Sequence, residues 1–485
     1  MNQEIRTLDP QDLWNNFSDL NAIPRASKKE ERVINFIVAF GKKLGLETII
    51  DPVQNVIIRK PATSGMENIK TIVLQSHLDM VHQKNADTDF DFDKEGIKML
   101  VDGDWVTADG TTLGADNGLG VAAIMSVLES TNIPHPAIEA LFTIDEETGM
   151  TGAMGLQAGY LNGEILLNLD TEEDDEIDIG CAGGIDVTAT KSYKEENVNG
   201  HIKAFQISVT GLSGGHSGMD IHKGLGNANK IMNRILMAVG DILQIVKING
   251  GSLRNAIPRE SFATIIISKE NVDMFKKIIE EVSKTIKTDF IEIENNLEIH
   301  MEVVERPKSV MNKKDQSLLL SAIKNAHNGV YKMSDEMEGL VEASNNIAKV
   351  TVENGSIKIE CLTRSSLDET KKEVSDLLKS TFENEGFMVS FSGSYPGWQP
   401  NLNSPILKIM EDIYKNVFEK KAKVVACHAG LECGILGKNY PDMDMISFGP
   451  TIRGAHSPDE RASISSVQKF WKYLLEILKN IPEKE

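Results

Sequence analysis

The chain contains 485 residues, with a formal net charge of -21 at pH 7 and a pI near 5.0. Its length exceeds what one hydrophobic core usually supports, so we expect two or more domains. The acidic charge argues against a nucleic-acid partner, because neutralising phosphates requires a basic face.

The sequence also gives no indication of a membrane or of an oxidising compartment. The first residues, MNQEIRTLDPQDLW, lack the apolar core of a signal peptide. No uninterrupted apolar stretch reaches the roughly 20 residues needed to span a bilayer. Four cysteines are too few for a disulfide framework in so long a chain. We therefore predict a cytoplasmic protein without a membrane partner.

Apolar strands and helices alternate in the first part of the chain. Helical periodicity over residues 31–46 is followed by two short strands within 48–60. Three strands that are apolar on both faces and one buried helix come next, at residues 71–75, 138–144, 164–169 and 118–130. This alternation predicts an α/β domain whose mainly parallel sheet is covered by helices on both faces.

The pattern changes after residue 186. Two strand-then-helix segments, 260–284 and 356–379, resemble each other, which leaves open whether this region contains two related α+β halves. Buried strands and helices return near residue 402 and end in a helix from Ser463 to Leu478. We therefore predict a catalytic domain formed by residues 1–186 and 391–485, with a large α+β lid domain inserted at 187–390.

Polar side chains follow the buried strands at the points where these strands end. The segments are Ser76-His77-Leu78-Asp79, Asp145-Glu146-Glu147, Asp170, and a loop that reaches His456, while Asp116 directly precedes the buried helix. Ligands of open parallel α/β sheets bind at the carboxyl ends of the strands, so these groups should converge there. Taken singly, each is more often a solvated or capping acid, and Asp116 alone fits an N-cap.

Two histidines and three carboxylates form a ligand set suited to two divalent ions. Asp116 is predicted to bridge the ions, with His77 and Asp170 on one and Glu147 and His456 on the other. Ions bridged in this way lie about 3.5–4 Å apart and convert a shared water into hydroxide near neutral pH. Zinc suits these ligands best, and cobalt and manganese remain alternatives.

Asp79, Glu146 and the acidic run 172–176 lie near the predicted ligands in sequence and have other predicted roles. Asp79 is two residues beyond His77, so its carboxylate can accept the imidazole N–H and fix the tautomer. Glu146 is adjacent to a ligand but points elsewhere, and is predicted to be the general base that deprotonates the bridging water. The acidic run 172–176 is predicted to be a solvated loop.

The segments SHLDMV, GADNGLG, DEETGMTGA, NLDTEE and GAHSPDER together resemble the co-catalytic metallopeptidases, a family that includes aminoacylases, glutamate carboxypeptidases, tripeptidases and dipeptidases. The resemblance implies the same five metal ligands, the same base and the same role for Asp79. Further segments, including GLSGGHSGMDIHKGLGNA, LRNAIPRE, GLVEASNN and CHAGLECGIL, resemble the branch of aminoacyl-histidine (Xaa-His) dipeptidases.

The resemblance also implies substrate contacts. His216 is similar to the family's lid histidine, which stabilises the developing oxyanion. Asn255 and Arg364 match carboxylate-binding positions, where a guanidinium can grip a carboxylate through two hydrogen bonds. Glu432 and His428 are predicted to line the substrate pocket, with a structural hydrogen-bonding role equally open for both. For His222, a lid role and simple exposure to water are equally open.

The prediction is therefore a metal-dependent dipeptidase that prefers Xaa-His substrates, including the β-alanyl-histidine type. A tripeptidase or an N-acyl amino acid deacylase is the alternative within the family. A non-catalytic binding protein is the alternative that is not an enzyme. The sequence leaves open whether the chain is a homodimer and whether His216 serves its own active site or that of a partner subunit.

Overall fold

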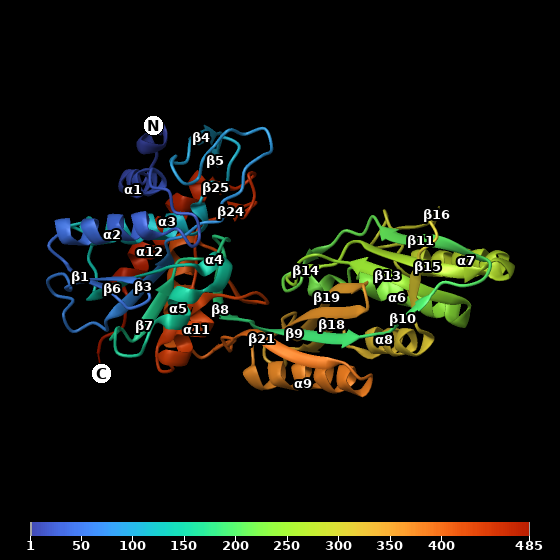
Figure 1. Cartoon of the computed structure of the whole chain (residues 1–485). Coiled ribbons are helices and arrows are strands. Elements are labelled where there is room, and N and C mark those ends of the chain that lie inside the picture. The colour runs from blue at the N-terminus through green and yellow to red at the C-terminus, as the bar shows by residue number, and fades with distance from the viewer. Residues whose placement is uncertain (1, 485) are drawn as a thin grey trace. The chain divides into compact units, whose positions relative to one another are not determined.

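The computed structural model describes residues 2–484, and its chain divides into two compact units (Figure 1). Unit 1 contains Met1–Gly180, Trp398–Ala426 and Leu431–Glu485, and unit 2 contains Cys181–Gly397 and Cys427–Gly430. The predicted boundaries were residues 187 and 390. The short segment Cys427–Gly430 differs from the prediction, which assigned it to the catalytic domain.

Hydrogen bonds explain why Cys427–Gly430 belongs to unit 2. The backbone N–H of Ala182 donates to the carbonyl oxygens of Cys427 and Ala429, at 3.1 and 2.9 Å. The Nε2 atom of buried His428 lies 2.8 Å from the hydroxyl oxygen of Ser344, which is also buried. These contacts attach the segment to the strands of unit 2, although its neighbours in sequence belong to unit 1.

Unit 1 is built on an eight-stranded sheet with the order β1-β2-β6-β3-β7-β23-β8-β22. The strands β6, β3, β7 and β23 are parallel neighbours, whereas β1, β2 and β8 pair antiparallel. Their bounds are β1 Glu47–Ile50, β2 Val56–Lys60, β3 Ile72–His77, β6 Ile138–Thr143, β7 Ile165–Asn168, β8 Glu176–Cys181, β22 Lys423–Cys427 and β23 Asp444–Ser447. The parallel centre confirms the predicted fold class.

Helices pack against this sheet because each presents an apolar face to it. The helix α2 contacts β1 and β2, α3 contacts β3, and α10 and α11 contact β23. Almost every residue of α3 is buried, as its apolar sequence predicted. The helices are α1 Gln11–Asn21, α2 Glu31–Lys43, α3 Ala115–Glu129, α4 Glu146–Gly149, α5 Thr151–Gly155, α10 Pro405–Phe418, α11 Glu432–Asn439 and α12 Ile464–Lys479, with the short η1 Ile5–Thr7.

A small four-stranded sheet completes unit 1, with the order β24-β25-β5-β4. Its strands are β4 Met99–Asp102, β5 Trp105–Ala108, β24 Ile452–Arg453 and β25 Arg461–Ser463. The loop between β24 and β25 carries His456. Among residues 2–484, no helix combines the length and the apolar character that crossing a membrane requires.

Unit 2 contains a nine-stranded antiparallel sheet with the order β16-β11-β15-β13-β19-β20-β9-β21, and β18 pairs with β19. Its strands are β9 Gly183–Ser192, β11 Ile202–Thr210, β13 Leu243–Gly250, β15 Ser261–Ser268, β16 Glu298–Val304, β18 Gly329–Met333, β19 Val341–Glu353, β20 Ser356–Ser365 and β21 Met388–Tyr395. Two short strand pairs, β10 Glu195–Asn197 with β17 Ser309–Met311 and β12 Gly215–His216 with β14 Ala256–Ile257, lie beside it.

Four α-helices accompany the sheet of unit 2: α6 Ala228–Val239, α7 Val272–Asp289, α8 Lys313–Asn325 and α9 Asp368–Asn384, with 3-10 turns η2 Ile221–Lys223, η3 Gly240–Ile242 and η4 Lys269–Asn271. The alternating faces of β9, β11, β15 and β20 bury apolar side chains against these helices in one core. The two similar segments noticed in the sequence are the pairs β15–α7 and β20–α9. This unit is the antiparallel α+β part that the prediction described as a lid.

Candidate active site

The candidate metal ligands lie at the carboxyl ends of the parallel strands of unit 1. His77 is the last residue of β3, and Asp170 follows the end of β7 by two residues. Glu147 is the second residue of α4, which begins shortly after β6. Asp116 stands at the start of α3, and His456 lies in the loop after β24. Distant parts of the sequence therefore meet because parallel strands end on one edge of a sheet.

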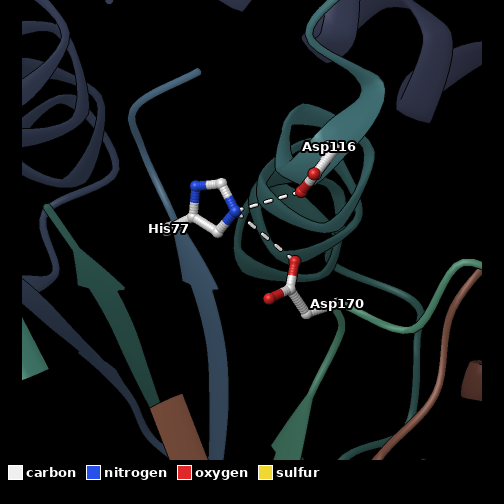
Figure 2. Close-up of side chains that lie close together, drawn as sticks. All are labelled: His77, Asp116 and Asp170. Carbon is white, nitrogen blue, oxygen red and sulfur yellow. Dashed lines mark hydrogen bonds and ion pairs between the residues drawn. The ribbon is translucent and has the colours of Figure 1, made fainter. Parts of the chain in front are cut away.

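Asp116 directs its two carboxylate oxygens toward two different imidazoles. Its Oδ1 atom lies 3.1 Å from Nε2 of His77, and its Oδ2 atom lies 3.2 Å from Nε2 of His456. Figure 2 shows His77 pointing toward both Asp116 and Asp170, and the Oδ1 atom of Asp170 lies 3.5 Å from the same Nε2. On the other side, Nε2 of His456 lies 3.0 Å from Oε2 of Glu147.

These residues fit a pair of divalent ions. His77, Asp116 and Asp170 form one group whose ligand atoms lie within 4.8 Å of one another, and Asp116, Glu147 and His456 form a second, while a third group joins His77 and Glu147 with Glu146. The first two groups contain the predicted ligands. Both groups contain only imidazole nitrogens and carboxylate oxygens, which suit zinc and its neighbours. Oε1 of Glu147 is buried without a hydrogen-bond partner among the described residues, as expected for an atom whose partner is a metal ion.

The charged state of these groups without metal follows from their crowding. Hydrogen bonds to Asp116 and Glu147 raise the pKa of His456 to about 11. Burial and the Asp116 carboxylate raise the pKa of Glu147 to about 7. Burial opposes protonation of His77, but the charge of Asp170 and the bonds to Asp116 and Asp79 outweigh it and raise the pKa of this imidazole. Protons on the histidines thus balance the carboxylates where cations are absent.

Asp79 connects the imidazole of His77 to the turn that carries the predicted base. Nδ1 of His77 lies 3.2 Å from the backbone carbonyl oxygen of Asp79 and 3.4 Å from its carboxylate Oδ1, and both are acceptors, which leaves Nε2 for a metal. The same carboxylate accepts the backbone N–H groups of Glu146 and Glu147, at 3.0 and 3.3 Å, and the hydroxyl of Ser27 at 2.8 Å. Burial tends to raise the pKa of Asp79, yet the bond to His77 makes the net shift downward.

Glu146 has the environment of a proton acceptor. Burial, together with the charges of Asp170 and Glu147, raises the pKa of its carboxyl well above the usual range, although His77 opposes this. The residue before it, Asp145, has a φ of 54°, a left-handed conformation that is uncommon for residues other than glycine. Such turns recur where a backbone must aim a functional side chain.

Two buried charged residues that the sequence interpretation did not identify hold the loop of Asp116. The carboxylate of Glu460 accepts four successive backbone N–H groups, those of Leu113, Gly114, Ala115 and Asp116, at 2.7–3.2 Å. The guanidinium of Arg25, only 1% exposed, donates to the carbonyl oxygens of Leu78, Asp79 and Gly114. Glu460 belongs to GAHSPDER, so its place in that segment was the available signal.

The acidic run after Asp170 differs from the solvated loop that was predicted. Glu173, Asp174 and Asp175 form ion pairs with Arg453, Lys469 and Lys423, respectively. Burial and the negative charge of Asp116 raise the pKa of Glu172 to about 8. The run is therefore held in place by cations from the end of the chain, and its first residue faces the metal-ligand carboxylates.

Three residues of unit 2 have predicted substrate roles, Arg364, His216 and Asn255, and they lie close to one another. Arg364 on β20 is 5% exposed, and its Nη2 atom lies 3.4 Å from Nε2 of His216. Its Nη1 atom donates to the hydroxyl of Tyr395 at 2.9 Å. Asn255 lies in the turn before β14, and its carbonyl oxygen accepts the N–H of Ser217, next to His216. Burial lowers the pKa of His428 to about 3, so this imidazole stays neutral.

Glu432 makes structural hydrogen bonds, the alternative that the sequence left open beside a place in the substrate pocket. Its side chain is fully buried at the start of α11 and accepts hydrogen bonds from Gln75 and Thr143, each at 2.6 Å. Burial raises the pKa of Glu432 to about 7. Donors from β3 and β6 therefore attach the start of α11 to the central sheet of unit 1.

Residues 73–480 match the peptidase family M20/M25/M40. The chain belongs to this family. It is 44% identical over 483 residues to the cytosol non-specific dipeptidase of Escherichia coli strain K12, which covers 99% of this chain and 100% of that protein. The crystal structure of aminoacylhistidine dipeptidase from Vibrio alginolyticus is similar as well, with 46% identity, a TM-score of 0.90 and coverage of 100% of this chain and 99% of that one.

A more distant structure shares the fold alone. The aminopeptidase PepT from Bacillus cereus has 16% identity and a TM-score of 0.58 over 98% of this chain and 99% of its own. Membership of the M20/M25/M40 family confirms the family and the peptidase class predicted from the sequence.

Glu460→Gln tests how Asp116 is held. The glutamine side chain offers one oxygen to the four backbone N–H donors, whereas the carboxylate offers two. Each buried N–H group that loses its acceptor destabilises the fold by about 1–3 kcal/mol. We expect the variant to bind metal 10–100-fold more weakly, the range typical of residues that support metal ligands. Calorimetric metal titration measures this, and Asp459→Asn, at the exposed neighbouring position, is the matched control. Equal affinities of both variants and the parent would contradict the assignment.

Metal binding should release protons and strengthen with rising pH. His456, with a pKa of about 11, is protonated at neutral pH in the metal-free protein, and Glu147, with a pKa of about 7, is partly so. Both must lose their protons to become ligands, so affinity should rise about tenfold per pH unit for each proton released. Titration calorimetry in buffers of different ionisation enthalpy counts these protons. Affinity independent of pH from 6 to 8 would contradict the ligand set.

Proposed function

We propose that this protein is a metal-dependent dipeptidase that prefers substrates with a C-terminal histidine. The observation that carries the proposal is the Asp116 carboxylate, whose two oxygens face two separate ligand groups next to the half-buried carboxyl of Glu146. Full-length similarity to a cytosol non-specific dipeptidase and to an aminoacylhistidine dipeptidase supports the substrate class. The name of the first relative also supports a cytoplasmic location.

His77, Asp116, Asp170, Glu147 and His456 would hold two divalent ions, with zinc as our proposed metal. Such ions polarise a carbonyl oxygen and lower the pKa of a bound water. Glu146 accepts the proton of the attacking water and delivers it to the leaving amine. Asp79 keeps His77 in the tautomer whose Nε2 faces the metal position, and its bonds to the N–H groups of Glu146 and Glu147 fix the base relative to the ligands.

The residues of unit 2 would recognise the substrate. We assign Arg364 to the C-terminal carboxylate, because a guanidinium binds a carboxylate through two parallel hydrogen bonds. Tyr395 holds one end of this guanidinium and sets its plane. Asn255 is assigned as a further donor to the carboxylate. His216 is assigned to the carbonyl oxygen of the scissile bond, where a donor stabilises the negative charge that develops.

The substrate class is tested by comparing turnover of His-terminal dipeptides, tripeptides and N-acetylated amino acids by the purified protein. We expect the highest kcat/KM on the dipeptides. Faster turnover of tripeptides would favour the tripeptidase alternative, and faster turnover of the acetylated amino acids would favour the deacylase. No turnover of any of them by a metal-loaded sample would leave only a non-catalytic binding role.

Glu146→Gln separates the base from the metal ligands. Loss of a positioned general base lowers kcat by about 10²–10⁴-fold. The metal content should stay at the parent value, because the ligand atoms are untouched. Steady-state kinetics combined with elemental analysis measures both quantities. A variant that turns over dipeptides at the parent rate would remove Glu146 from the mechanism.

Arg364→Lys tests carboxylate recognition. A lysine keeps the charge but not the paired donors, so we expect KM for dipeptides to rise about tenfold or more, with kcat changing less. A dipeptide whose C-terminus is amidated should be a poor substrate of both proteins, and should not respond to the substitution. Arg259→Lys, at an exposed position, is the control. An unchanged KM would assign Arg364 a role outside substrate binding.

A further inference from the structure

Beneath the metal-ligand residues, seven buried polar side chains form a continuous row through unit 1. None of them is more than 7% exposed. A carboxylic acid stands at each end, Asp178 on β8 and Glu432 at the start of α11. The members in spatial order are Asp178, Thr171, Ser447, Asn168, Gln75 and Glu432, with Thr143 beside the last two.

Short hydrogen bonds join each neighbour to the next. Oδ2 of Asp178 lies 2.7 Å from Oγ1 of Thr171, which lies 2.8 Å from the hydroxyl oxygen of Ser447. The Ser447 hydroxyl donates to Oδ1 of Asn168 at 2.5 Å, and Nδ2 of Asn168 donates to Oε1 of Gln75 at 2.5 Å. Nε2 of Gln75 donates to Oε2 of Glu432 at 2.6 Å.

The row runs directly below the ligands on the same side of their strands. Gln75 precedes His77 by two residues on β3, so the two side chains share a face, and Asn168, the last residue of β7, precedes Asp170 by two residues. The backbone register places Gln75 opposite Asn168, and Ser447 opposite both Asn168 and Asp178. A change in the row therefore acts on the strand ends that carry two metal ligands.

The four inner groups of the row have one hydrogen fewer than its hydrogen bonds require. Five bonds join the six groups from Asp178 to Glu432, and each bond needs one hydrogen. The four inner groups supply four, because Thr171 and Ser447 have one hydroxyl hydrogen each and each amide donates through its nitrogen on one side only. The Ser447 hydroxyl already donates to Asn168, so Thr171 must donate to Ser447 and cannot also donate to Asp178. The fifth hydrogen must come from a carboxylic acid.

We propose that Asp178 and Glu432 hold a single proton between them, carried by Asp178, so that every hydrogen bond points toward an ionised Glu432. Glu432 is then a positioning residue, whose charge orients Gln75 and Asn168 and through them the strand ends that carry His77 and Asp170. If the hydrogen bonds pointed the other way, the proton would lie on Glu432. The side-chain amides of Asn168 and Gln75 would then have to exchange the positions of their nitrogen and oxygen atoms. Burial raises the pKa of both acids to about 7, consistent with one proton shared at neutral pH.

The surroundings of the two ends differ in charge. Glu176 is the charged neighbour that acts on Asp178, and its negative charge favours the protonated form. His77 lies near Glu432 and favours its ionised form, against burial and the charges of Asp170 and Asp79. Oε2 of Glu432 accepts two donors, from Gln75 and Thr143, so a proton on this acid would lie on Oε1, which is buried without a hydrogen-bond partner among the described residues. Divalent ions beside His77 and Asp170 would strengthen this preference.

Infrared difference spectroscopy of the purified protein at neutral pH, recorded without added metal, tests where the proton is. The carbonyl band of a protonated carboxylic acid should disappear in Asp178→Asn and remain in Glu432→Gln. Loss of the band in Glu432→Gln alone would place the proton at the other end, and no band lost in either variant would mean that both acids are ionised. Either result overturns the proposal.

Metal titration calorimetry tests the positioning role. The amide introduced by Asp178→Asn can still donate to Thr171, so this variant should bind metal within about threefold of the parent, whereas loss of the Glu432 charge should weaken binding about tenfold or more. Equal effects of the two substitutions would contradict the role. The metal titration rests on the proposed two-metal site, whereas the infrared measurement does not. A parent protein that binds no metal would refute the proposed function and leave the proton test intact.

Ser447→Ala provides a second route in case Glu432→Gln does not fold. Without that hydroxyl, Thr171 is able to donate to Asp178, and Asp178 no longer has to supply a hydrogen. The infrared band should then disappear at a lower pH than in the parent protein. A band that disappears at the same pH as in the parent protein would contradict the proposed direction of the hydrogen bonds.

Discussion

The position of the Asp116 carboxylate is the constraint on which the rest of the site depends. Its two oxygens must face two imidazoles that come from opposite ends of the chain, His77 and His456. A free loop would not hold a carboxylate in this way, because fixing each residue costs about 1–2 kcal/mol of backbone entropy. Glu460 offsets that cost by accepting four consecutive N–H groups of the loop, and Arg25 attaches the same loop to the end of β3.

Charge balance explains why so many acids can be buried together. Glu146, Glu147, Asp170 and Glu172 all have raised pKa values, with burial as the largest cause in each case. Buried anions require protons or cations, and in the metal-free chain this balance comes from protons on the two histidines, protons on the acids with raised pKa values, and Arg25. Divalent ions supply the same balance and free the histidine nitrogens, so the arrangement is suited to metal.

The sequence predicted the elements and ligands that depend on local patterns. Buried strands such as β3 and β6 are apolar on both faces, and the residues at their ends are polar, so this local pattern is enough to place His77 and Glu147 at one sheet edge. Contacts that arise from long-range packing do not follow from such patterns. Glu432 has no neighbour in sequence that reveals its contact with Gln75, 357 positions away, and Cys427–Gly430 joined unit 2 through contacts that no local pattern encodes.

The most direct test of the account is a crystal structure of the metal-loaded protein with anomalous diffraction measured at the absorption edge of the bound metal. We expect two anomalous peaks per chain, about 3.5–4 Å apart, on either side of the Asp116 carboxylate. One peak should contact His77 and Asp170, and the other Glu147 and His456. A single peak, or two peaks that do not share Asp116, would contradict the two-metal site.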